Sequence, residues 1–284
     1  HLAGIKTYSK TAWENLFSEC DLAYEFLYPF PDYKLPEQVL SDHYVQEYPQ
    51  SWTHVTASRP RDYHGLIKDY TDIPFWETMS QADRLGDLAN SFLIVASNRP
   101  NTTREIANRD FIHASNLQRQ PQYRTLTEKP RGTERTIKRL IDPTIQARAS
   151  EKLIHLAPFE EPFHAGVPLA NQWEMHLRIK LSESTFFSLI EPYYAFIKTT
   201  FLSAPDQRKL LDLTPMNIMA MSDGSHKAFD LEWQSDFSLT PEFIFFRGIF
   251  YFLQSRRRLI EPMYRGNPEL TIGDAISRCF EHIG

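Results

Sequence analysis

An α+β fold is predicted for this chain of 284 residues by the order of its hydrophobic patterns. Residues 1–100 combine one helical pattern with strand-like runs. A strand-rich stretch follows, and amphipathic helical patterns fill most of the remainder. The apolar share of 42% and the charged share of 24% are typical of a globular protein, and a chain of this length can bury a proper core.

Composition excludes several classes of protein. A net charge of −5 and a pI near 6.1 give no general attraction to nucleic acid or to an anionic membrane. Cys20 and Cys279 are too few for a disulfide framework, so a reduced, cytoplasmic setting is expected. The chain has no run of 18 apolar residues, so no transmembrane segment is predicted. The glycines form neither GxGxxG nor GxxxxGK[ST], and the histidines form no zinc motif.

The first block opens with helical spacing over residues 8–17, for which Ser9 is a suitable N-cap. Residues 23–30 alternate like a strand, and the apolar, β-branched run at 89–97 is typical of a buried strand. Between these two runs, residues 42–72 are polar with interspersed aromatics and prolines, which indicates a long excursion.

The polar stretch 98–104 is the best linker candidate, and it predicts one domain over 1–100 and another over 105–284. Two strand-like runs, 123–128 and 133–141, flank the turn sequence Pro130-Arg131-Gly132 and predict a hairpin. Helical spacing is then expected from about 145 to 156.

Three further helices are predicted in the second block. The first begins at Ser182 or Ser184 as N-cap, and its apolar residues recur at intervals of three and four. Pro192 should bend this helix. A second long helix is expected over 241–259 and a shorter one over 272–282.

The residues with the clearest chemistry lie between the two long helices. Phosphoryl transfer needs a carboxylate to orient the attacking hydroxyl and oxygen ligands to hold Mg²⁺. Asp212 and Asn217 have the D-x4-N spacing of kinase catalytic loops, and Asp230 follows beyond a turn at Asp223-Gly224 that lets the chain fold back. The alternative is that Asp212 caps a helix, Asn217 forms a turn and Asp230 ends a strand.

The motifs LDLTPMNI and FDLEW in residues 211–233 resemble the aminoglycoside-phosphotransferase and choline-kinase branch of the kinase superfamily. They are similar to the kinase-like domains fused to methyltransferases in bacterial O-antigen and other surface-polysaccharide assembly. The resemblance covers residues 110–280 and implies a bilobal kinase-like fold that uses ATP and Mg²⁺. It implies that Asp212 is the catalytic base-like residue and that Asn217 and Asp230 are Mg²⁺ ligands.

The chain departs from this family in two places. Leu210 stands where the family usually has His, and Glu232 stands where it has the Gly of DFG. Glu232 is either a further metal ligand or the sign of a degenerate site, which leaves a pseudokinase binding module as an alternative function.

The resemblance places the phosphate-positioning Lys on the second strand of the predicted hairpin, where Lys138 lies, with Lys129 and Lys152 as competitors. Glu151 is a candidate ion-pair partner for Lys138. No glycine-rich loop precedes them, so residues 115–119 would have to cover the nucleotide. The three arginines at 256–258 are expected to end a helix rather than to bind an anion.

Residues 6–9 with the helix that follows them, together with 28–36 and 88–97, resemble the last helix and closing strand pair of a class I methyltransferase-like domain. The loop of such domains that binds S-adenosylmethionine would lie before His1, so this segment is not expected to bind that cofactor alone. Asp32, Tyr33 and Lys34 are either acceptor-side residues or a Pro-framed strand end. The full resemblance thus predicts a phosphotransferase acting on a sugar or glycan acceptor in lipopolysaccharide biosynthesis, with a methyltransferase as the remaining alternative. The apolar strands of residues 1–100 could pair with a second copy of the chain, which would make the protein a homo-oligomer.

Overall fold

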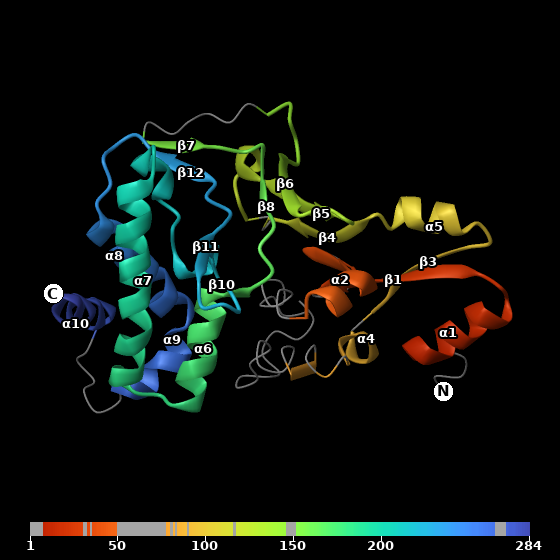
Figure 1. Cartoon of the computed structure of the whole chain (residues 1–284), viewed down its shortest axis with the longest axis horizontal. Helices are drawn as coiled ribbons and strands as arrows, with labels where there is room; N and C mark the ends of the chain where they lie inside the picture. Colours follow the sequence, from red (N-terminus) through yellow and green to blue (C-terminus); the bar gives the residue numbers. More distant parts are fainter. Residues whose placement is uncertain are drawn as a thin grey trace. The chain divides into compact units, whose positions relative to one another are not determined.

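The computed structural model describes residues 8–30, 33–34, 36–49, 78–79, 82, 84–89, 91–115, 118–145, 152–264 and 271–284. The chain divides into two compact units, His1–Asp142 and Pro143–Gly284 (Figure 1). Both contain helices and strands, so the predicted α+β class is confirmed. None of the helices in the described ranges combines the length and apolar character that crossing a membrane requires.

The first unit is built on an antiparallel sheet. Its helices are α1 (Lys10–Glu19), α2 (Asp42–Glu47), α4 (Leu85–Leu88) and α5 (Pro100–Ile106). Its strands are β1 (Ala23–Phe30), β2 (Gln38–Ser41), β3 (Leu93–Ser97), β4 (Arg109–Ala114), β5 (Thr125–Pro130) and β6 (Arg135–Leu140). They pair in the order β3-β1-β2-β4-β5-β6, with every neighbouring pair antiparallel.

Local sequence signals account for much of this unit. Ser9 accepts a hydrogen bond from the backbone N–H of Ala12 and caps α1, as predicted. The strand at 23–30 and the hairpin β5–β6 are also confirmed. The stretch 98–104, predicted as a linker, instead contains most of α5, because Pro100 fits the first turn of a helix. The two units divide between Asp142 and Pro143, and β2 pairs with β4 across the stretch expected to be a linker.

A charged cluster is buried in the first unit. Lys129 Nζ lies 2.6 Å from Asp110 Oδ2, and both side chains are almost completely buried. His43 Nδ1 lies 3.0 Å from Asp110 Oδ1, and Arg131 Nε lies 3.6 Å from the same oxygen. Lys129 also lies over the ring of Tyr48 at 4.9 Å. This cluster ties α2 to β4 and β5 and uses its cations to balance one carboxylate.

The second unit combines helices with two small sheets. Its helices are α6 (Leu169–Ile179), α7 (Glu183–Ser203), α8 (Pro241–Ser255), α9 (Arg257–Ile260) and α10 (Ile272–Ile283). Its strands are β7 (Leu153–His155), β8 (Phe159–Pro162), β9 (Val167–Pro168), β10 (Ile218–Ala220), β11 (His226–Ala228) and β12 (Trp233–Ser235). One sheet has the order β11-β10-β9, and the other pairs β12 with β7.

The long helices of this unit follow their sequence signals. Ser182 caps α7 by accepting from the N–H of Thr185, and α10 begins with a capping box of Thr271 and Asp274. The expectation of a helix up to about 156 is wrong over the described part of that stretch. Leu153–His155 is instead strand β7, because it pairs with Trp233–Ser235. The α6 helix was not predicted.

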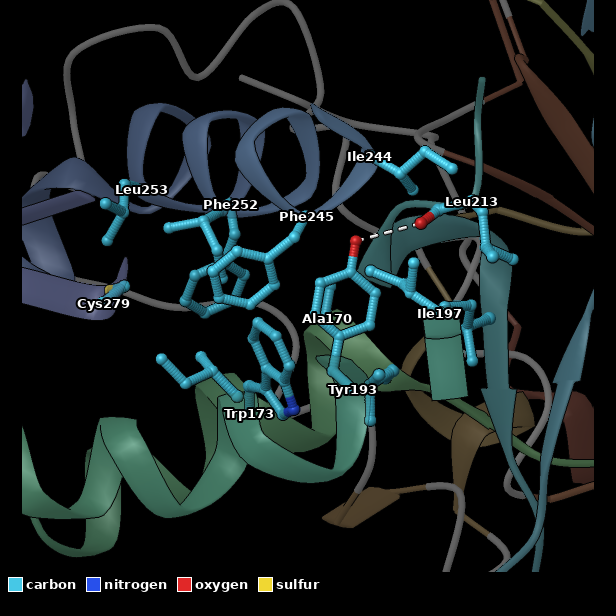
Figure 2. Close-up of a cluster of buried hydrophobic side chains, with 14 of the residues drawn as sticks. Ala170, Trp173, Tyr193, Ile197, Leu213, Ile244, Phe245, Phe252, Leu253 and Cys279 are labelled. Carbon is cyan, nitrogen blue, oxygen red and sulfur yellow. Dashed lines mark hydrogen bonds between the residues drawn. The ribbon is translucent and has the colours of Figure 1, made fainter. Parts of the chain in front are cut away.

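The core of the second unit lies between α6, α7, α8 and α10 (Figures 1 and 2). Trp173 of α6 makes edge contacts with Phe186 and Tyr193 of α7 and with Phe252 of α8. Interlocked rings of this kind give the helices one fixed arrangement. The segment that carries Asp212 is anchored to this arrangement.

Candidate functional site

Residues 211–217, which we call the Asp212 loop, run from the end of η4 (Gln207–Leu210) into β10. Leu211 and Leu213 are buried on either side of Asp212. The hydroxyl of Tyr193 donates to the carbonyl of Leu213 at 2.9 Å (Figure 2), and Arg247 Nε donates to the carbonyl of Leu211 at 3.1 Å. Two helices, α7 and α8, therefore hold the backbone immediately before and after Asp212.

The D-x4-N spacing produces a closed turn. Thr214 N–H donates to the carbonyl of Asp212 at 2.6 Å, and Asn217 N–H donates to that of Thr214 at 2.9 Å. The side-chain amide of Asn217 then reaches back, with Nδ2 3.1 Å from the carbonyl of Asp212. Because the nitrogen end of the amide is used for this bond, its oxygen is left to accept from another donor or to bind a cation.

A hairpin brings Asp230 beside Asn217. Strands β10 and β11 pair from Ile218 opposite Ala228, and the chain turns at Gly224, whose φ of +81° suits glycine. Beyond β11, Phe229 N–H donates to the carbonyl of Asn217 at 3.0 Å. The predicted fold-back at Asp223-Gly224 is confirmed, and this bond places the residue before Asp230 against the backbone of Asn217.

Asp230 has a strained backbone. Its φ is +54°, in the left-handed region, which costs most residues with a side chain about 1–2 kcal/mol and costs Asp less. Its N–H lies 2.9 and 3.1 Å from the two carboxylate oxygens of Glu161, on β8. Neighbouring structure therefore holds Asp230 in this conformation, as is common at functional sites.

Asp212, Asp230 and Glu232 are close enough to influence one another. The pKa of Asp212 is raised from 3.8 to about 6, chiefly by burial, with Arg247 lowering it and the negative charges of Glu232 and Asp230 raising it. Arg247 Nη2 lies 3.2 Å from Asp212 Oδ1. Asp212 thus lies in a concentration of carboxylates in contact with one cation.

Glu232 is the most deeply buried of these three carboxylates. Its carboxylate is 3.5 Å from Nε2 of His155 on β7, and its backbone carbonyl accepts from the N–H of Leu156 at 2.8 Å. His155 thus gives Glu232 a neighbour within the protein, and a carboxylate that binds a metal can keep such a neighbour.

The oxygen donors of Asn217 and Asp230 fit Mg²⁺, a hard cation that commonly takes one or two protein ligands and completes its shell with phosphates and water. Within the described ranges, no three His, Cys, Asp or Glu side chains form a group able to hold a metal on their own.

Three other predicted positions are Lys138, Glu151 and Arg256. Lys138 is buried on β6 of the first unit, opposite Thr127. Glu151 lies outside the described residues, as do two positions of the 115–119 segment. Arg256 ends α8 and binds Glu174 of α6 at 2.7 Å, which confirms a structural role for that arginine.

Sequence reasoning missed three neighbours of the site: Arg247, Glu161 and His155. None of them belongs to a recognisable motif, and the position of Arg247 within a largely apolar helix was the one available signal. Comparisons with protein-family models, with curated proteins and with solved structures find no match.

Proposed function

We propose that the chain is an ATP- and Mg²⁺-dependent phosphotransferase that acts on a hydroxyl of a sugar or another small acceptor. The observation that supports this most is the grouping of Asp212, Asn217 and Asp230 through the loop turn and the β10–β11 hairpin. The resemblance of the motifs to polysaccharide-modifying kinases suggests a glycan acceptor in bacterial surface-polysaccharide assembly.

In this proposal Asp212 accepts a hydrogen bond from the acceptor hydroxyl and receives its proton as the phosphoryl group is transferred. A carboxylate with a pKa of about 6 is ionised at neutral pH and is more basic than an ordinary Asp, which suits that role. Asn217 and Asp230 would hold Mg²⁺, whose chemistry is to neutralise charge on the phosphates. Lys138 would position the phosphates.

Nucleotide binding tests the proposal directly. At 100 times the dissociation constant, ATP with Mg²⁺ should stabilise the fold by about 2.7 kcal/mol, an increase of about 5–10 °C in Tm. Asp230→Asn should lose most of this increase. Asp223→Asn is the matched control, because Asp223 is exposed in the turn of the same hairpin, where it accepts from the N–H of Ser225. An equal increase in Tm for wild type and Asp230→Asn would contradict the assignment.

Transfer itself is measured with ATP labelled in the γ-phosphate and a panel of sugars and glycans. Asp212→Asn should still bind ATP with Mg²⁺, although less tightly than wild type because it lacks one carboxylate, and should lose transfer by about 10²-fold or more. Transfer at the wild-type rate by this variant would exclude Asp212 as the base.

A binding module without catalysis is the second candidate. Its support is that Asp212 is already engaged by Arg247 and that Glu232 lies against His155. Such a module would show the ATP-dependent Tm increase without transferring phosphate to any acceptor or to water.

A further inference from the structure

Arg247 contacts two consecutive residues of the Asp212 loop with different atoms. Its Nε donates to the carbonyl of Leu211 at 3.1 Å, and its Nη2 donates to Asp212 Oδ1 at 3.2 Å. The guanidinium plane is supported in turn by Tyr251, one helical turn along α8, whose ring centroid lies 5.1 Å from Cζ. The backbone and the carboxylate are therefore fixed by one rigid group.

The two carboxylate oxygens of Asp212 have different surroundings. Oδ1 is the oxygen bound by Arg247, and no residue of the described ranges donates a hydrogen bond to Oδ2. The side chain keeps 14% of its exposure, so it is open to solvent on one side. A guanidinium donor directs its N–H groups along fixed lines, so it selects one carboxylate oxygen and one orientation of the carboxylate plane.

A glycine in α8 allows this helix to approach the Asp212 loop closely. Gly248 follows Arg247, and a Cβ there would lie 1.9 Å from the hydroxyl of Tyr193 and 3.0 Å from Cδ of Pro215. A glycine at this point costs helix stability, about 1 kcal/mol relative to Ala. It allows α8 to lie against the loop at the distance that lets Arg247 reach both of its partners.

Holding the loop backbone does not by itself require an arginine. Tyr193 holds another carbonyl of the same loop, that of Leu213, with a neutral hydroxyl. Placing a guanidinium in a partly buried position costs desolvation that an apolar side chain would avoid. The charged group is therefore explained by the carboxylate it contacts.

We propose that Arg247 is a positioning residue that holds Asp212 by Oδ1 and thereby presents Oδ2 to the acceptor hydroxyl. This inference rests on the proposed phosphotransferase function. A base displaced by about 1 Å loses roughly 10²-fold in rate, because the reacting atoms must meet in a narrow range of geometries.

The kinetic test compares Arg247→Met with Tyr193→Phe, which removes a hydrogen bond to the same loop without touching the carboxylate. Arg247→Met should lower kcat by about 30–100-fold and leave KM for ATP within about threefold, whereas Tyr193→Phe should lower kcat by less than about fivefold. Arg247→Lys should be intermediate, because a lysine keeps the charge and loses the fork. Added guanidinium ion, at concentrations too low to unfold the protein, should restore part of the activity of Arg247→Met.

A second measurement does not depend on activity. Amide hydrogen exchange at Leu213, Thr214 and Asn217 should be at least about tenfold faster in Arg247→Met, while the amides of α10 exchange as in wild type. If the wild type transfers no phosphate but exchange changes in this way, the proposed function fails and Arg247 still positions the loop. Unchanged exchange, or a kcat for Arg247→Met no lower than that for Tyr193→Phe, would overturn the inference.

Discussion

Replacing Asp212 with Asn should stabilise the metal-free protein at neutral pH. In the folded state the pKa of Asp212 is raised from 3.8 to about 6, chiefly because burial disfavours the charged carboxylate. Each tenfold change in proton affinity corresponds to about 1.4 kcal/mol, so keeping Asp212 ionised at pH 8 costs the fold about 3 kcal/mol. Asn has nearly the same shape and carries no charge, so it avoids this cost.

The pH dependence gives the prediction its sign. The folded state binds the Asp212 proton more tightly than the unfolded state does, so the contribution of this group is complete below pH 3.8 and is lost as pH rises through about 6. Asp212→Asn should therefore exceed wild type in stability by up to about 3 kcal/mol at pH 8, or about 6–12 °C in Tm. The difference should shrink between pH 6 and pH 4.

Thermal and urea unfolding at several pH values, with a chelator present, measure this difference. Asp223→Asn is again the control, because the pKa of Asp223 is lowered by its hydrogen bond to Ser225 and removal of that charge should give no stabilisation at pH 8. The reasoning is refuted if Asp212→Asn is less stable than wild type at pH 8, or if the difference between them is the same at every pH.

Three further substitutions test other parts of the structure. Gly248→Ala should destabilise the fold by about 1–3 kcal/mol in urea unfolding, because its Cβ would collide with the Tyr193 hydroxyl, and Tyr193→Phe in the same chain should relieve part of that loss. Lys129→Met removes the nearest cation of the buried Asp110 and should cost about 3–5 kcal/mol, with less lost when Asp110→Asn is added. Asp230→Gly should relieve about 1 kcal/mol of backbone strain, seen as a higher Tm without ligand, and should abolish the Tm increase caused by ATP with Mg²⁺.

The parts of the fold that could be predicted from sequence are those that depend on neighbouring residues. The caps at Ser9 and Ser182 could be predicted because a capping bond spans only three residues. Strand β7 could not be predicted, because its three residues become a strand only by pairing with β12, some eighty residues later. In isolation the apolar residues there suit a helix equally well.

The same distinction applies to the site. Asp212 and Asn217 could be related from sequence because one tight turn joins them, and Asp230 because a hairpin returns the chain to Asn217. Arg247 reaches the site from α8, whose position is set by the core of the second unit, and Glu161 reaches it from β8, 69 residues before Asp230. No spacing rule connects them with Asp212, so only the folded chain reveals them.

Several residues of the site are unfavourable for the stability of the fold, which is expected of a functional site and not of a loop that only connects two elements. Asp212 is ionised at a position that raises its pKa, Asp230 is held at a positive φ, and Glu232 is buried beside them. A loop that served only as a connection would gain stability by replacing these residues with neutral or more flexible ones. The arrangement is favourable if a cation binds, because it then offsets the repulsion among the carboxylates. Mg²⁺ with ATP should therefore raise the Tm of wild type more than that of Asp212→Asn, in which part of the repulsion is already gone.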